Sequence, residues 1–442
     1  MLVLYLVISV LLIIFLTARL DVHPFIALLL VALMYGIAAG MPAENIIKSV
    51  NDGFGKTLGG IGLIIILGVI IGAFLENSGG AYSIAEKILK VIGKDRVPAA
   101  MGIIGWFVSI PVFADSGFLL LAPLNRSLSK KAKISLAGSA IALSLGLTAS
   151  HTMVPPTPGP IAASGILGVD LGMVLLVGIP VSLIALPAAI FFATKYAGKT
   201  YIDPNPQISD EELRIRTENA PGAFKSSLPV IVPIVLIVLN STLKAVKGMN
   251  GTLTSIISFI GEPFVALLIG VLLSLLLPKK LDKEMLSTTG WIGKSLSGAA
   301  SIILITGAGG IFGKVLQDSG IAGVLGKTLA QLNLSIWLPF LLAAAIKTAQ
   351  GSSTVSLITT ASIMAPLMDK LGFVDSLEKA MVVIAIGAGS AVVSHANDSF
   401  FWVVTQMSGM DTRMGYRMQT MGTFVLGVTS AVVVFAAHLI LN

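Results

Sequence analysis

The sequence predicts an all-α polytopic membrane protein with two inverted-topology repeats, each containing a re-entrant hairpin and a broken transmembrane helix. Three observations lead to this prediction. The 442-residue chain is 55% hydrophobic and only 12% charged, apolar segments recur along its whole length, and several short motifs occur twice in the same order. Soluble proteins carry about 25% charged residues. Too few polar side chains are therefore present to cover a water-facing surface of this size.

Several classes of protein are excluded by the composition. The absence of cysteine excludes disulfides, thiolate metal sites and cysteine nucleophiles. The net charge of +7 indicates cytoplasmic loops in a membrane protein, and we expect no nucleic-acid partner. The apolar segment 1–17 lacks a basic region and a small-residue cleavage site, so we interpret it as a retained first helix. We expect no cofactor and no metal, since the four histidines form no H-E-x-x-H motif.

Motifs of the first half recur in the second half in the same order and at a nearly constant offset, which indicates an internal repeat. We expect residues 1–196 to form the first transmembrane repeat, 197–227 a cytoplasmic hydrophilic linker, and 228–442 the second, inverted repeat. The motif pairs are HPFIALL at 23–29 and EPFVALL at 262–268, GKTLGG at 55–60 and GKSLSG at 293–298, ENSG at 76–79 and QDSG at 317–320, and SH at 150–151 and 394–395.

Apolar runs long enough to cross a bilayer predict helices throughout both halves. The amphipathic segment 80–94, with Lys87, Lys90 and Lys94 on its polar side, predicts a further helix that lies along the membrane surface. The spanning helices are expected at 1–17, 23–40, 58–75, 134–169 and 171–194 in the first half, and at 228–245, 256–277, 296–316, 377–408 and 418–441 in the second.

Two further apolar segments, 98–125 and 334–368, are interrupted by polar residues. Each consists of two short arms, and an arm of about 13 residues reaches only the middle of the bilayer at 1.5 Å per residue. The interruptions read PVFADSG at 111–117 and KTAQGSST at 347–354. We therefore predict one re-entrant hairpin in each half.

With hairpins at these positions, the strongly basic loops all lie on one side of the membrane, which the positive-inside rule identifies as the cytoplasm. The helix that begins at His23 then runs outward, whereas its repeat partner, which begins at Glu262, runs inward. Inverted repeats with broken helices are typical of secondary transporters, in which one site near the midplane is exposed to each side in turn. The basic loops lie at 87–96, 126–133, 279–294 and 413–417.

Polar residues at four breaks are the candidates for a binding site. Besides the hairpin tips, the helices near 134–169 and 377–408 are interrupted at 150–160, which is rich in proline, and at 394–399. Backbone that leaves a helix within the hydrocarbon must be buried in protein or line a wet cavity, and half-helix N-termini there suit a carboxylate. The substrate-binding candidates are His151, Thr152, Thr157, Gly159, Lys347, Gln350, Gly351, Ser352, Ser353, Thr354, Asn397 and Ser399, with the hydroxyl of Ser116 as a further contact.

Ionisable side chains within a membrane are costly and usually functional. This makes Asp115, His151, His395 and Asp398 the candidates for proton coupling, with Asp115 ranked first and His151 second. Each also has a structural alternative. The two aspartates could cap helices, the two histidines could be hydrogen-bonded core residues, and Lys347 could snorkel or pair with a carboxylate.

At these residues the sequence resembles the gluconate permease family of the ion transporter superfamily. The resemblance covers essentially the full length of the chain, and it implies symport of gluconate, or of relatives such as other sugar acids, glycerate or D-serine, with protons. It rests on VPPTPGP at 154–160, QGSSTV at 350–355, SHANDS at 394–399, and the acidic tip at 111–117 with the following LLAPL at 120–124.

The sequence is also compatible with other functions. The same architecture is compatible with a sodium-coupled carrier for di- or tricarboxylates, because unwound backbone carbonyls can coordinate Na⁺. A passive channel would not accumulate its substrate, and an intramembrane enzyme is disfavoured because no nucleophile–base pair occurs at motif spacing. We expect a multi-pass protein of the cell's inner membrane whose partners are a small carboxylate, protons or sodium, and the lipid bilayer. The sequence leaves a homo-oligomer open.

Overall fold

The computed structural model describes residues 1–93, 96–204, 220–245, 252–321 and 334–441, and the regular structure within them is entirely helical. The first half contains α1 Leu2–Arg19, α2 Pro24–Ala38, α3 Ala43–Asn77, α4 Gly80–Ile92, α5 Val97–Val108, α6 Ala114–Lys131, α7 Leu136–Met153, α8 Pro158–Leu167 and α9 Leu171–Lys195. The second half contains α11 Ala223–Ala245, α12 Thr252–Ile260, α13 Pro263–Ser274, α14 Trp291–Asp318, α16 Trp337–Gln350, α17 Ser353–Met364, α18 Ser376–Ala391, α19 Ser399–Ser408, α20 Thr412–Gly415 and α21 Met421–Leu441.

The breaks that the sequence predicts are present. The two hairpin segments fold as the helix pairs α5–α6 and α16–α17, and the two interrupted helices divide into α7–α8 and α18–α19. Within the described residues, six helices are long and apolar enough to cross a membrane, namely α1, α3, α9, α11, α14 and α21. Many of the remaining helices are short because a break divides them.

Two predicted helices differ from the structure. The segment 256–277 is not one helix, because α12 and α13 meet at an angle of 66°. The bend precedes Pro263, and a residue before proline is disfavoured in helical conformation. The helix predicted at 58–75 begins much earlier, at Ala43. Its polar first turns are stabilised by the end of α14, where the carboxylate of Asp318 accepts a hydrogen bond from Ser49 Oγ at 2.7 Å.

Parts of several predicted segments lie outside the described residues, including residues 94 and 95 of the predicted basic loop 87–96. In the predicted linker 197–227 these are residues 205–219, and in the predicted amphipathic helix 80–94 the last residue is one of them. The described part of the latter segment is helix α4, which ends at Ile92.

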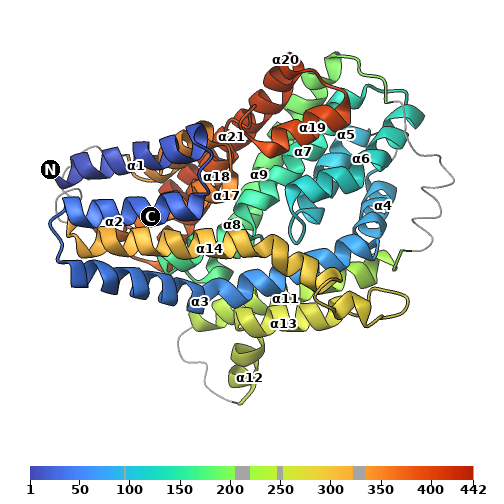
Figure 1. The fold of residues 1–442 in the computed structure, drawn as a ribbon. Coiled ribbons are helices and arrows are strands. Elements are labelled where there is room, and N and C mark those ends of the chain that lie inside the picture. Colours follow the sequence, from blue (N-terminus) through green and yellow to red (C-terminus); the bar gives the residue numbers. More distant parts are fainter. Residues whose placement is uncertain (94–95, 205–219, 246–251, 322–333, 442) are drawn as a thin grey trace.

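The two long helices α3 and α14 lie side by side and run in opposite directions (Figure 1). The start of α3 meets the end of α14 at Gly53, where an added Cβ would lie only 2.6 Å from the carbonyl oxygen of Gly310. The end of α3 meets the start of α14 at Phe74, whose ring packs edge-on against Trp291 with centroids 5.2 Å apart. Helix α2 packs beside this pair, and α1 packs on α2.

The hairpins and half-helices pack across the two halves of the chain. Helix α17, from the second hairpin, packs against α8, and α6, from the first hairpin, packs against α19. The rings of Phe118 and Phe400 join the second pair, with centroids 6.1 Å apart. The α8–α17 pair also packs on α3 and α14. The α6–α19 pair instead faces α14 across a cavity.

Close packing between α5 and α7 gives a test of the fold. A Cβ at Gly146 of α7 would lie 2.0 Å from the carbonyl oxygen of Gly102 of α5. We expect Gly146→Ala to destabilise the protein by about 1–3 kcal/mol, because overpacking forces backbone to move. Gly60→Ala is the matched control, since no atom lies within 4 Å of its added Cβ. Thermal unfolding of the purified variants measures both, and equal melting temperatures would contradict this packing.

Candidate functional site

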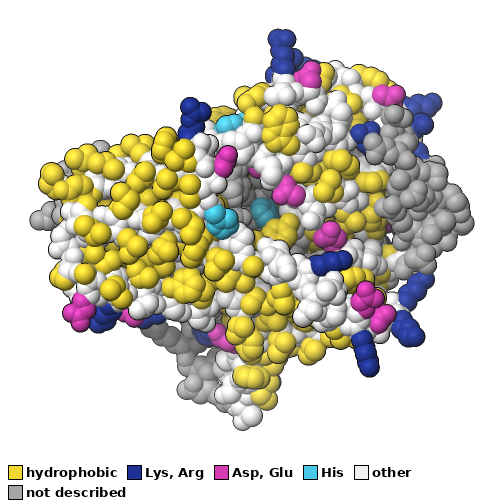
Figure 2. All heavy atoms as spheres, in the orientation of Figure 1, with side chains coloured by type: hydrophobic (Ala, Val, Ile, Leu, Met, Phe, Trp, Pro, Cys, Tyr) yellow, Lys and Arg dark blue, Asp and Glu magenta, His cyan; other side chains and the backbone are white. Residues whose placement is uncertain are grey.

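A cavity of about 430 Å³ lies where the two hairpins, α7, the α18–α19 break and α14 converge. Figure 2 shows the molecule hollowed near the centre of one face, with acidic and histidine side chains around the hollow. The residues that line the cavity are Phe113, Ala114, Asp115, Thr148, His151, Ser301, Ile302, Ile305, Lys347, Gln350, Gly351, Ser352, Ser353, Thr354, Val355, Ala391, Ser394, Asn397, Asp398, Ser399 and Phe400.

Three helix N-termini lie at this cavity, those of α6, α17 and α19. The first backbone N–H groups of a helix have no partner within it, and the helix dipole adds partial positive charge there. The arrangement therefore suits an anion. The N-terminus of α8 does not contribute, because Thr157 and Gly159 are absent from the lining.

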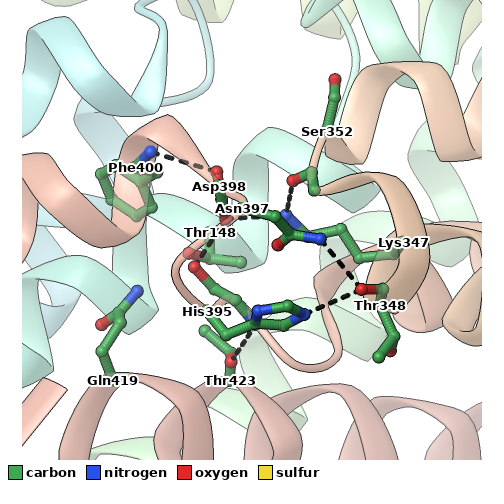
Figure 3. Close-up of polar contacts among 12 residues, drawn as sticks. Thr148, Lys347, Thr348, Ser352, His395, Asn397, Asp398, Phe400, Gln419 and Thr423 are labelled. Atoms are coloured by element: carbon green, nitrogen blue, oxygen red, sulfur yellow. Dashed lines mark hydrogen bonds and ion pairs between the residues drawn. The ribbon is translucent and has the colours of Figure 1, made fainter. Parts of the chain in front are cut away.

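A buried ion pair joins the second hairpin to the α18–α19 break (Figure 3). The Nζ of Lys347 lies 2.7 Å from Oδ2 of Asp398, and it also donates to the carbonyl oxygen of Gly351. The lysine side chain is only 1% exposed. Asp398 additionally accepts from Ser394 Oγ at 2.5 Å and from the backbone N–H of Phe400 at 3.0 Å. The carboxylate therefore both caps α19 and neutralises the lysine.

The tip of the second hairpin is fixed by close contacts with the break. Gly351 has φ +91°, and an added Cβ would lie 2.0 Å from the carbonyl oxygen of Asn397, so only glycine fits. Asn397 Nδ2 and His395 Nε2 both lie within 2.9 Å of the carbonyl oxygen of Thr348 (Figure 3). These contacts hold the break against the end of α16.

The amide of Gln350 is used within the turn itself. Its Oε1 accepts from the N–H of Ser352 at 3.0 Å, and its Nε2 donates to the carbonyl oxygen of the same residue at 2.5 Å. The hydroxyl of Ser352 in turn accepts from the N–H of Val355 at 3.3 Å and caps α17. Gln350 therefore shapes the tip that presents the N-terminus of α17.

Two buried polar atoms of the cavity lining have no hydrogen-bond partner among the described residues. They are Oδ1 of Asp115, in the first turn of α6, and Nδ1 of His151, near the end of α7. The ring of Phe113 packs beside His151, with centroids 6.2 Å apart. Buried polar groups are almost always hydrogen-bonded. We therefore expect these two atoms to bind a proton, a water molecule or a ligand.

Most of the residues proposed from the sequence meet at this one cavity. Four of the five ionisable candidates line it, and so does the serine- and threonine-rich tip of the second hairpin. Those that line it are Asp115, His151, Lys347, Gln350, Gly351, Ser352, Ser353, Thr354, Asn397, Asp398 and Ser399.

Five sequence candidates lie elsewhere. His395 makes the contact to Thr348 described above, and Ser116 lines a separate cavity beside α3. The hydroxyl of Thr152 donates to the carbonyl oxygen of Thr148 at 3.0 Å, and that of Thr157 to Val154 at 2.7 Å. Gly159 packs against Leu357 of α17. In this structure the hydroxyls of Thr152 and Thr157 are used by nearby backbone.

Three polar lining residues were missed from the sequence, namely Thr148, Ser301 and Ser394. Thr148 lies three residues before His151 and so on the same helical face, a signal that helical periodicity provides. Ser394 precedes the proposed His395 and bonds Asp398. Ser301 comes from α14, whose position opposite the breaks no local pattern indicates. In the part of the chain that the structure describes, no three His, Asp or Glu side chains gather to hold a metal ion.

Comparisons with known proteins identify relatives of this chain among permeases. A family model described as GntP family permease matches residues 1–440. The chain is 34% identical to a gluconate permease of Pseudomonas aeruginosa, covering 96% of this chain and 95% of that protein. It is 32% identical to the low-affinity gluconate transporter of Escherichia coli K12 (98% and 97% covered), and 38% identical to an uncharacterized permease of Haemophilus influenzae (92% and 86% covered).

A solved structure shares the fold. The YdaH transporter of Alcanivorax borkumensis, described as having an unusual topology, superposes with a TM-score of 0.64. The two chains are 13% identical, and the match covers 93% of this chain and 97% of that one. At this identity the likeness concerns the fold alone.

Proposed function

Since this chain belongs to the GntP permease family, we propose that it is a secondary active transporter that imports gluconate, or a related small hydroxylated carboxylate, by proton symport. The membership confirms the resemblance drawn from the sequence motifs. It also makes the chain a multi-pass inner-membrane permease, not an enzyme. The observation that supports the proposed substrate best is the pairing of one buried lysine with three helix N-termini in a single cavity.

The substrate carboxylate is assigned to Lys347 and to the N-termini of α17 and α19. An ammonium group has three donors, and two of those of Lys347 are used, by Asp398 and by the Gly351 carbonyl. Hydroxyl and amide groups around the same cavity would meet the substrate's own hydroxyls. The cavity of about 430 Å³ falls within the range of roughly 300–1,000 Å³ that small-molecule sites occupy. The hydroxyl and amide groups are those of Ser352, Ser353, Thr354, Asn397 and Ser399.

Proton coupling follows from the charges that line the cavity. Among the described lining residues these are one lysine, Lys347, and two aspartates, Asp115 and Asp398. With both aspartates ionised and His151 neutral, the cavity carries a net charge of −1, which disfavours an anionic substrate. Protonation of Asp115, which has no basic partner in hydrogen-bonding contact, removes this repulsion. The proton and the carboxylate then bind together more readily than the carboxylate alone.

The contacts at the hairpin tip favour protons over sodium as the coupling ion. A sodium site of the expected kind needs free backbone carbonyls at a helix break. The carbonyl of Gly351 already accepts from Lys347, and that of Thr348 contacts His395 and Asn397. A cationic group therefore occupies the position at the tip where Na⁺ would be coordinated.

The proposed inverted repeat of residues 1–196 and 228–442, joined by the linker 197–227, is supported by the antiparallel α3–α14 pair. It is also supported by the packing of helices from different halves, since α6 of the first half packs on α19 of the second and α8 of the first half packs on α17 of the second. The basic end of α6, with Lys130 and Lys131, is assigned to the cytoplasm. Because the α6–α19 pair faces α14 across the cavity whereas the α8–α17 pair packs directly on α3 and α14, we assign this conformation as open to the cytoplasm.

Transport then requires the hairpins and half-helices to move against the remaining helices until the cavity faces the other side. Uptake of labelled gluconate into proteoliposomes tests the whole proposal. We expect accumulation when the interior is alkaline, its loss on addition of a protonophore, and no change when choline replaces sodium. Loss of uptake in choline would instead indicate a sodium-coupled carrier. Equilibration without accumulation would indicate a channel, and uptake of glycerate or D-serine alone would identify a permease with a different substrate.

A further inference from the structure

The cavity has a second wall that the proposed site does not use. The hairpins, α7 and the α18–α19 break contribute all of its charged side chains. The opposite wall is α14, which contributes Ser301, Ile302 and Ile305. Of the lining residues, Ser301 is therefore the one polar side chain on α14, and it faces the cavity beside two apolar neighbours.

Ser301 is held by a histidine from another helix. Its Oγ lies 2.8 Å from Nε2 of His23, the residue that caps the N-terminus of α2. The other ring nitrogen of His23 accepts a hydrogen bond from the backbone N–H of Phe25 at 3.3 Å. A nitrogen that accepts cannot carry the proton, so in a neutral ring the proton is on Nε2. His23 therefore donates to Ser301.

This donation leaves the hydroxyl hydrogen of Ser301 available. A serine in a helix commonly donates to the carbonyl four residues earlier, and Ser297 of the same helix donates to Gly293 in this way. Among the described residues, His23 is the one hydrogen-bond partner of the Ser301 hydroxyl. The orientation imposed by His23 thus presents a free O–H donor to the cavity.

We propose that Ser301, oriented by His23, binds a hydroxyl of the substrate remote from its carboxylate and so selects for chain length. The inference rests on the proposed function, which places the carboxylate at Lys347 on the first wall. A hydroxylated chain that extends from there toward α14 meets Ser301 only if it is long enough. A six-carbon aldonate such as gluconate extends further across the cavity than three-carbon glycerate does.

Uptake kinetics of both acids in proteoliposomes test this inference. Ser301→Ala should raise the KM for gluconate about three- to tenfold, the effect of one neutral hydrogen bond, and leave the KM for glycerate within about twofold. Ser301→Thr keeps the hydroxyl and should retain most of the gluconate affinity. His23→Ala should raise the gluconate KM in the same direction, and the double variant should add little to Ser301→Ala.

Ser297→Ala, one turn earlier on the same helix, is the matched control and should change neither KM. The inference is overturned if Ser301→Ala leaves the gluconate KM unchanged, or if it raises both KM values equally, which would indicate a general structural role. Failure of the proposed substrate looks different, because the unmodified protein would then take up no gluconate and both proposals would fall together.

Discussion

Replacing Lys347 with methionine is expected to weaken substrate binding and uptake strongly, and also to destabilise the folded protein. Methionine resembles the lysine side chain in length but offers neither charge nor donors. The buried carboxylate of Asp398 would then lose its ion-pair partner at 2.7 Å, and removing one partner of a buried pair costs about 3–5 kcal/mol. Loss of a charged hydrogen bond to the substrate carboxylate should weaken binding by about 10- to 100-fold.

The double variant Lys347→Met with Asp398→Asn separates the two effects. Asparagine caps helices as well as aspartate does and keeps an acceptor for the N–H of Phe400, so the melting temperature should largely recover. Binding should not recover, because the positive charge is still missing. The increase of melting temperature with added gluconate measures binding, and proteoliposome uptake measures transport.

Lys379→Met serves as the control, since that lysine lies 3.6 Å from the exposed carboxylate of Asp369 on the surface. It should leave both measurements unchanged. If the double variant bound gluconate as tightly as the unmodified protein, Lys347 would be a structural residue only, and the proposed position of the carboxylate would have to be abandoned.

The fold was predictable from the sequence where its signals are local. A run of prolines after His151 and polar residues inside apolar runs identify backbone breaks by their chemistry alone, and the structure contains all four breaks. The bend between α12 and α13 has a weaker signal, a single proline at 263. The extension of α3 to Ala43 has none, because its polar first turns are stabilised by contacts with α14, as between Ser49 and Asp318.

The candidate site was likewise predictable only where its residues have a local sequence signal. Residues from each of the four breaks line one cavity, although Thr157 and Gly159 of the break at 150–160 do not. The sequence prediction chose the wrong threonine of α7. It named Thr152, which is adjacent to His151 in sequence, whereas Thr148 lies on the same helical face as His151 and lines the cavity with it. The pairing of Lys347 with Asp398 spans 51 positions, and Ser301 faces both from a separate helix. Such relations depend on tertiary packing, and one sequence gives no local signal for them.

Asp115→Asn is expected to separate substrate movement from the proton gradient. Asparagine has nearly the same shape as aspartate but takes up no proton in the physiological range. With Lys347 and Asp398 charged and His151 neutral, the cavity of the variant would carry no net charge, so gluconate could still bind and exchange. With one proton per substrate, a gradient of two pH units supports at most about 100-fold accumulation. The unmodified protein should approach such a value, whereas the variant should only equilibrate its substrate.

Two measurements on the same proteoliposomes distinguish coupling from simple damage. Counterflow of labelled gluconate against unlabelled gluconate should persist in Asp115→Asn, because it needs binding and movement but no net proton transfer. Accumulation driven by an alkaline interior should be lost. Asp52→Asn, in a separate cavity between α3 and α14, is the control and should keep both activities. If Asp115→Asn still accumulated gluconate, the carboxyl group would not carry the proton. His151, whose Nδ1 is also buried without a partner among the described residues, would then be the next residue to replace.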